Sequence, residues 1–255
     1  MEYKPFYALL IGILISNTCC ATDQGYKEGG IYSSVRFNKS SEVVQVPVSS
    51  SQFSKLNVSP NLNSFREPKK RDARSTVYAI CFTFDMWEKA LKKLETNNQA
   101  WLNWENRADI TVYPFVQGNT QNAFYNPKDK SLNFYYSPNS FYMCRSFDTV
   151  AHESGHAFLD AILPIYNQPI NGEHSISRDA MHEAFGDISA IMASIEVALV
   201  ENKFQEVDQF LRVDDIGDLA VRGPTGSCIR NAADHVGHVT TQMHDLSKPF
   251  TQAFF

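Results

Sequence analysis

The sequence predicts an α+β fold of two lobes, with strands in the first part of the ordered chain and helices in the second. Apolar runs rich in β-branched and aromatic residues, separated by turn residues, occupy much of residues 76–137, and such runs are typical of strands. From Ser146 onward the apolar residues recur at the period of a helix. The chain has 255 residues, of which 43% are hydrophobic, so it is long enough to bury a core.

The N-terminal part of the chain is expected to lie outside that core. Residues 1–21 have the features of a secretory signal peptide. Lys4 is followed by the apolar run Phe6–Ser16, and small residues allow cleavage after Ala21. The run is short for a bilayer span, although an uncleaved membrane anchor is the alternative interpretation. Residues 22–75 are polar and end in a charged run, which predicts a poorly ordered segment, a linker or a short pro-segment.

A secreted or periplasmic protein is therefore expected, without stable membrane association after signal cleavage. The formal net charge is -5 and no basic stripe is present, which argues against nucleic acid as a partner. Three cysteines would remain after cleavage, namely Cys81, Cys144 and Cys228. They permit one disulfide and one thiol, or three buried thiols, and the sequence leaves the pairing open.

Residues 76–163 are predicted to form the strand-rich lobe. The apolar run Thr76–Phe84 is expected to be a strand, and Asp85 is expected to cap an amphipathic helix that follows it. Asp109–Val116 is a second predicted strand. In Asn122–Ser137 two apolar stretches flank "NPKDK", whose residue types favour a turn, so this segment is predicted to be a hairpin.

Residues 164–255 are predicted to form a helical lobe. One helix covers Phe147–Leu163 and leads into it, ending before Pro164. A second helix covers Ser177–Val200, with its first serine as the candidate N-cap. A last helix is expected to begin near Pro249.

The strongest indication of chemistry is the pair His152 and His156, with Glu153 directly after the first histidine. Residues four apart on a helix lie one turn above each other on one face. Two imidazoles so placed can share one tetrahedral metal ion. Glu153 points about 100° away from that face, where it can act as a general base beside the metal.

The predicted helix Ser177–Val200 supplies a third ligand. Glu183 and Asp187 lie four residues apart on one face of an otherwise apolar helix, and buried carboxylates are costly unless they are paired or bind a metal. With Glu183 as the ligand, Asp187 can orient a ligand imidazole through its other ring nitrogen. His182 lies about 100° off that face and is expected to be exposed.

Five blocks of sequence, in this order, resemble the zinc metalloproteases of the thermolysin and fungalysin type, the gluzincins with an HExxH…E ligand set. They are similar to the family's edge strand, its zinc helix, its second ligand helix, the segment with its substrate-binding arginine and the segment that opens with its transition-state histidine. The blocks are "NAFY" (Asn122–Tyr125), "DTVAHESGH", "HEAFGDI", "GSCIRNAAD" (Gly226–Asp234) and "HDLSKPFTQAFF" (His244–Phe255).

This resemblance implies a thermolysin-like two-lobed fold and a secreted, zinc-dependent endopeptidase with Glu153 as general base. It implies that Asn122 and Ala123 hydrogen-bond a peptide or protein substrate as an added strand. It also implies that Arg230 holds a substrate carbonyl.

The same resemblance implies that His244 stabilises the oxyanion of the transition state. Tyr166 resembles a tyrosine that assists there, and His174 competes for that place.

The family continues well beyond its transition-state histidine, whereas this sequence stops 11 residues after His244, so the helical lobe is expected to be truncated. The alternative hypothesis is therefore a catalytically impaired, zinc-containing relative that acts as an exported peptide-binding protein. Calcium is a further possible cofactor, with incomplete ligand sets.

Overall fold

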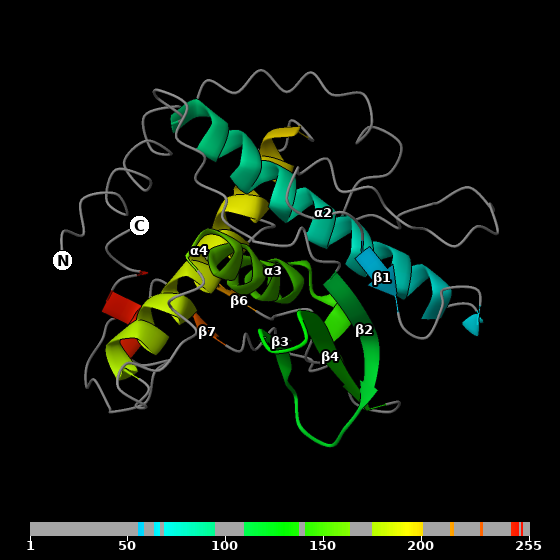
Figure 1. The fold of residues 1–255 in the computed structure, drawn as a ribbon. Helices are drawn as coiled ribbons and strands as arrows, with labels where there is room; N and C mark the ends of the chain where they lie inside the picture. Colours follow the sequence, from blue (N-terminus) through cyan, green and yellow to red (C-terminus); the bar gives the residue numbers. More distant parts are fainter. Residues whose placement is uncertain are drawn as a thin grey trace.

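A computed structural model shows a mixed α+β fold, as predicted, with a sheet beside a group of packed helices (Figure 1). The prediction of two lobes is not tested by the structure. The residues that the structure describes are 56–58, 64–66, 69–94, 110–137, 141–163, 175–200, 215–216, 230–231, 246–249 and 251.

The main sheet has five strands in the described part of the chain. The order is β1 (Leu56–Val58), β2 (Ile110–Gln117), β4 (Ser131–Ser137) and β3 (Ala123–Asn126), and β5 (Phe141–Tyr142) also pairs with β4. The pairs β1–β2 and β2–β4 are parallel, whereas β3 and β5 run antiparallel to β4. The predicted strand Asp109–Val116 is thus confirmed as β2.

The predicted hairpin is confirmed as β3 and β4, joined by a turn. Ala123 pairs with Phe134 in the register of the two strands. In the turn, the Asn126 side chain accepts the Lys128 N–H at 3.1 Å, and Lys130 has a φ of 52°. Among the described strands β3 pairs with β4 alone, and on its other edge the Tyr125 N–H donates to Glu153 of α3.

The prediction for the segment before β2 was wrong. The run Thr76–Phe84 is the middle of helix α2 (Lys69–Leu94), and Asp85 lies inside that helix rather than at its N-terminus. The Thr76 hydroxyl donates to the Asp72 carbonyl, one turn earlier, at 2.9 Å. This bond satisfies a buried hydroxyl within the helix. Because α2 begins at Lys69, the last residues of the predicted linker also belong to it.

The two helices predicted around the metal site are confirmed as α3 (Phe147–Ile162) and α4 (Ile176–Val200). The N-cap of α4 differs from the prediction, because the Ser175 carbonyl accepts the Arg178 and Asp179 N–H groups at 2.9 and 3.0 Å. The candidate cap Ser177 therefore lies inside the helix.

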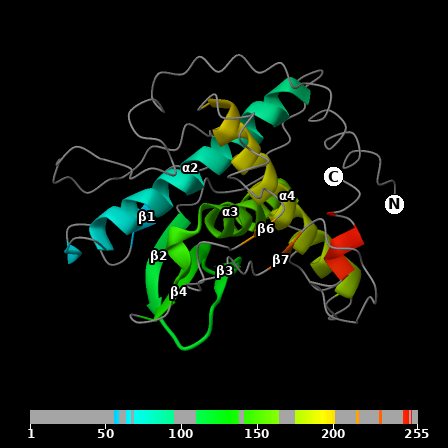
Figure 2. The same cartoon turned by 180° about the vertical axis from the view of Figure 1, so that it is seen from behind.

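Helix α3 lies at the centre of the molecule, in contact with α2, α4 and β3, and views from both sides show it between the sheet and α4 (Figures 1 and 2). The Trp87 ring of α2 stacks on Phe158 of α3 and Phe185 of α4, with ring centroids 6.2 and 4.6 Å apart. The buried indole N–H of Trp87 donates to the Ser189 hydroxyl at 2.9 Å. One side chain thus joins three helices and fixes their relative position.

The C-terminal part contributes a small second sheet and a helical turn. Strands β6 (Asp215–Ile216) and β7 (Arg230–Asn231) pair antiparallel. The described residues around Pro249 are helical, as predicted. Of the helices that the structure describes, none is both long and apolar enough to cross a bilayer. The proposed signal segment, residues 1–21, lies outside the described residues.

Candidate metal centre

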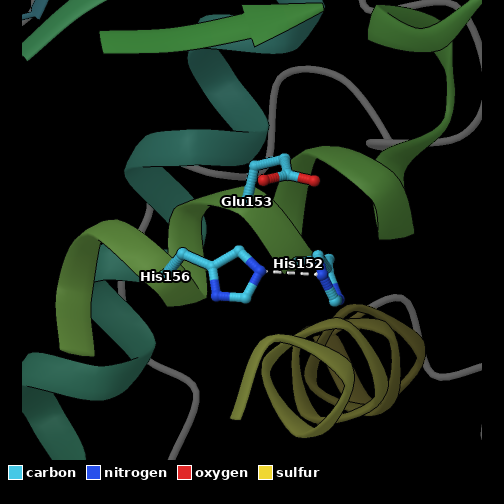
Figure 3. Close-up of side chains that lie close together, drawn as sticks. All are labelled: His152, Glu153 and His156. Atoms are coloured by element: carbon cyan, nitrogen blue, oxygen red, sulfur yellow. Dashed lines mark hydrogen bonds between the residues drawn. The ribbon is translucent and has the colours of Figure 1, made fainter. Parts of the chain in front are cut away.

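Two imidazoles of α3 meet at the centre of the candidate site. His152 and His156 are 4% and 7% exposed, and their Nε2 atoms lie 2.9 Å apart (Figure 3). The helical spacing of four residues brings them to one face, as the sequence predicted. Each ring points the same kind of nitrogen at the same position, which is what two ligands of one metal ion require.

Helix α4 brings a carboxylate to the same position. Glu183 Oε2 lies 3.4 Å from His152 Nε2, and Glu183 Oε1 lies 3.6 Å from His156 Nε2. Ligand atoms 2.0–2.1 Å from one tetrahedral zinc ion are about 3.3 Å apart. The observed separations are close to that value, and two imidazoles with one carboxylate are a common zinc ligand set. The three residues therefore fit a zinc ion.

Glu153 lies next to these three residues, but its carboxylate is bonded to the main chain of β3. Its ligand atoms lie within 4.8 Å of those of the two histidines, so it too could reach a metal ion. However, Glu153 Oε2 accepts the main-chain N–H of Tyr125 at 3.0 Å, and Figure 3 shows its carboxylate apart from the line between the imidazoles. Glu183 therefore approaches both Nε2 atoms, whereas one carboxylate oxygen of Glu153 is occupied by the main chain of β3.

The second nitrogen of His152 has an acidic partner. His152 Nδ1 lies 2.9 Å from Asp187 Oδ1, the partner that the sequence predicted. A carboxylate can only accept, so it favours a proton on Nδ1 and leaves Nε2 for a metal. Gly186 makes room for this ring, since a Cβ there would lie 2.6 Å from His152 Cε1. The sequence analysis did not identify this glycine.

The prediction that His182 is exposed was wrong. His182 Nδ1 lies 2.6 Å from His156 Nδ1, and the centroids of the two rings are 4.6 Å apart. Burial lowers the pKa of His182 below its ordinary value. The apolar face of a packed helix is often more than 100° wide, so a residue 100° from Glu183 can still lie against the neighbouring helix.

A buried phenol also ties β3 to α3, and sequence reasoning missed it. The Tyr125 hydroxyl donates to Asp160 Oδ2 at 2.8 Å, and both residues are at least nine-tenths buried. Burial and the adjacent Asp160 carboxylate raise the pKa of Tyr125, so the phenol stays a donor. Because the Tyr125 N–H also bonds Glu153, one residue connects the edge strand to two turns of the helix.

The remaining predicted site residues are placed only in part. Asn122 is exposed and directly precedes β3, whose first residue is Ala123. Arg230 pairs through its backbone with Ile216. His244 lies outside the described residues. The same is true of Tyr166 and His174, so the choice between these two stays open.

Comparison with known families agrees with this geometry. The model of the thermolysin metallopeptidase catalytic domain matches residues 16–160, more than half of the chain. The match includes the β3–β4 hairpin and the cluster of His152, Glu153 and His156, which fits the HExxH pattern. It ends before α4 and therefore does not include Glu183. A comparison with curated proteins found no match. The chain belongs to the thermolysin family of metallopeptidases, as the sequence blocks predicted.

Proposed function

We propose that this protein is a secreted, zinc-dependent endopeptidase in which Glu153 is the general base. The observation that carries the proposal is the convergence of His152, His156 and Glu183 from two helices, with Glu153 held beside them. Family membership supports a metallopeptidase. Secretion rests on the signal-like residues 1–21 alone.

In the proposed hydrolysis the metal ion and the protein side chains have separate roles. A bound zinc ion supplies Lewis acidity, which makes water more acidic and polarises a substrate carbonyl. Glu153 takes a proton from the attacking water through Oε1, because the Tyr125 N–H holds Oε2. The same carboxyl then gives that proton to the leaving amine. Asp187 keeps His152 oriented throughout by the contact of its Oδ1 with His152 Nδ1.

The open edge of β3 is the proposed binding site for the peptide. The Asn122 carbonyl accepts the Tyr135 N–H of β4 at 3.0 Å, whereas the Tyr125 N–H points the other way, towards α3. Main-chain groups alternate in direction along a strand, so Ala123 presents its N–H and carbonyl to the open edge. A substrate can add there as a strand, next to Glu153.

Three further residues complete the proposal through the family resemblance. Arg230 holds a substrate carbonyl, and His244 stabilises the oxyanion together with Tyr166 or His174. Removing one donor of this kind typically lowers kcat by about 10²–10³-fold.

The deciding experiment measures zinc content and peptide cleavage on the full chain and on Glu153→Gln. The amide oxygen of glutamine can still accept the Tyr125 N–H, so the fold and zinc binding should persist. Cleavage of a peptide library should fall by about 10²–10⁴-fold, the usual contribution of a general base. Glu196→Gln makes the same chemical change more than three turns beyond Glu183 and serves as the matched control.

Each outcome of this experiment has a distinct meaning. Stoichiometric zinc with undiminished cleavage by Glu153→Gln would reject the role of Glu153. Zinc and peptide binding without any cleavage by the native chain would support the catalytically impaired relative. A native chain without zinc affinity would reject both functions.

A further inference from the structure

We propose that His182 is a positioning residue for the metal centre. Its imidazole accepts the Nδ1–H of His156 and so fixes the tautomer in which His156 Nε2 faces the metal. This inference rests on the proposed function, because it takes His156 Nε2 as a ligand atom. It concerns a residue that neither the HExxH pattern nor the third ligand position includes.

The two rings lie within hydrogen-bond distance of each other. His156 Nδ1 and His182 Nδ1 are 2.6 Å apart, a separation that fits a hydrogen bond in which one ring donates and the other accepts. The opposite nitrogen of His156 faces His152 Nε2 at 2.9 Å. The Nε2 of His156 therefore faces the metal position, and its Nδ1 faces His182.

The direction of this hydrogen bond follows from the proton count. A neutral imidazole carries one proton, and a metal ligand needs its lone pair. When His156 Nε2 binds the metal, the proton of His156 must be on Nδ1, so Nδ1 of His182 has to accept. The proton of His182 then belongs on its Nε2, a buried atom that makes no hydrogen bond with the described residues. The two rings meet edge to edge, with their centroids 4.6 Å apart and their planes 27° from parallel.

The two ligand imidazoles thus have chemically different partners. The Nδ1 of His152 contacts the carboxylate of Asp187, whereas the Nδ1 of His156 contacts the neutral ring of His182. The site already gathers three acidic side chains, Glu153, Glu183 and Asp187, and a fourth would add repulsion between like charges. His182 orients its ligand without adding that charge.

Two variants separate the hydrogen bond from the packing of the ring. His182→Phe keeps an aromatic ring against His156 but offers no acceptor, and His182→Asn keeps an acceptor without the ring. Met181→Leu changes the neighbouring side chain and controls for local packing. Zinc affinity is measured by competition with a chelator, and thermal unfolding of the metal-free forms reports their stability.

The expected result is a loss of zinc affinity of about 10–100-fold in His182→Phe, as for other partners of metal ligands. His182→Asn should recover most of that loss, and Met181→Leu should bind zinc as the native chain does. Native affinity in His182→Phe, with zinc and cleavage present in the native chain, would overturn this inference and leave the proposed function intact. A native chain that binds no zinc would overturn both.

A second measurement needs no variant. Nitrogen NMR of the zinc-loaded native protein distinguishes the tautomers of each histidine. The proton of His182 should be on Nε2, and a proton on its Nδ1 would contradict the proposed direction of the bond.

Discussion

Replacing Gly186 by alanine tests how tightly the metal centre is built. A Cβ at this position would lie 2.6 Å from His152 Cε1, 2.8 Å from its Nδ1 and 2.9 Å from its Nε2. Carbon atoms in contact are normally about 3.5–4.0 Å apart. The ring, or the whole of α4, must therefore move by about 1 Å.

That displacement is large for a metal ligand. The ring of His152 is already held by Asp187 at 2.9 Å and lies 2.9 Å from His156 Nε2. Metal–ligand distances tolerate only about 0.2 Å. We expect Gly186→Ala to lower zinc affinity by at least 10-fold, comparable to the loss of a partner of a metal ligand.

The effect on stability has two opposing parts. Overpacking costs about 1–3 kcal/mol, and alanine in a helix gains about 1 kcal/mol over glycine. The metal-free variant should therefore be destabilised by no more than about 2 kcal/mol, so that it still folds. Chelator competition and thermal unfolding measure the two quantities separately.

Gly155→Ala is the comparison variant for this experiment. Its Cβ would meet first the Oγ and Cβ of Ser189 and then the Cα of Gly186, so it overpacks the same helix crossing, and none of these nearest atoms belongs to a ligand ring. It should lose less zinc affinity than Gly186→Ala for the same loss of stability. Native zinc affinity in Gly186→Ala would refute the claim that this glycine makes room for His152.

Three further predictions concern other contacts. Asp187→Asn should lower zinc affinity by about 10–100-fold, because an amide no longer requires a proton on His152 Nδ1; an unchanged chelator titration would contradict this. Tyr125→Phe removes a buried donor to Asp160, so it should destabilise the protein by about 1–3 kcal/mol in denaturant titrations and lower kcat more than it raises KM. Burial, with a smaller effect of a nearby carboxylate, raises the pKa of Cys144 from 9.0 to about 12. Its thiol should resist alkylation at pH 8 in the native protein, as peptide mass analysis can check, and its stabilising contribution should be lost as pH rises from 9 towards about 12.

The sequence predicted the elements that carry the site because their patterns are local. The hairpin of β3 and β4 is marked by turn residues between two apolar runs, and α3 by its apolar period and the following Pro164. Helix α2 was mistaken for a strand because Thr76–Phe84 is rich in β-branched and aromatic residues. A short apolar run does not distinguish a strand from a helix that is buried on several sides.

The approach of His152 and His156 could be predicted for a similar reason, since residues four apart on one helix must share a face. The contact of His182 with His156 and the bond from Tyr125 to Asp160 could not be predicted, because both depend on how α4 and β3 pack against α3. Spacing within one element contains no information about that packing. The contact of Gly186 with His152 is of the same kind.

The burial of α3 has a consequence for how the protein opens. All of its residues except Asp148 are buried, and its neighbours are α2, α4 and β3. Segments of this kind exchange their amide hydrogens only when the whole domain unfolds. The HExxH helix therefore cannot fray from one end, and the integrity of the catalytic centre becomes a property of the entire core. Substitutions far from the metal, such as those around Trp87, should therefore first weaken metal binding and make the protein more sensitive to proteolysis, before they change its substrate specificity.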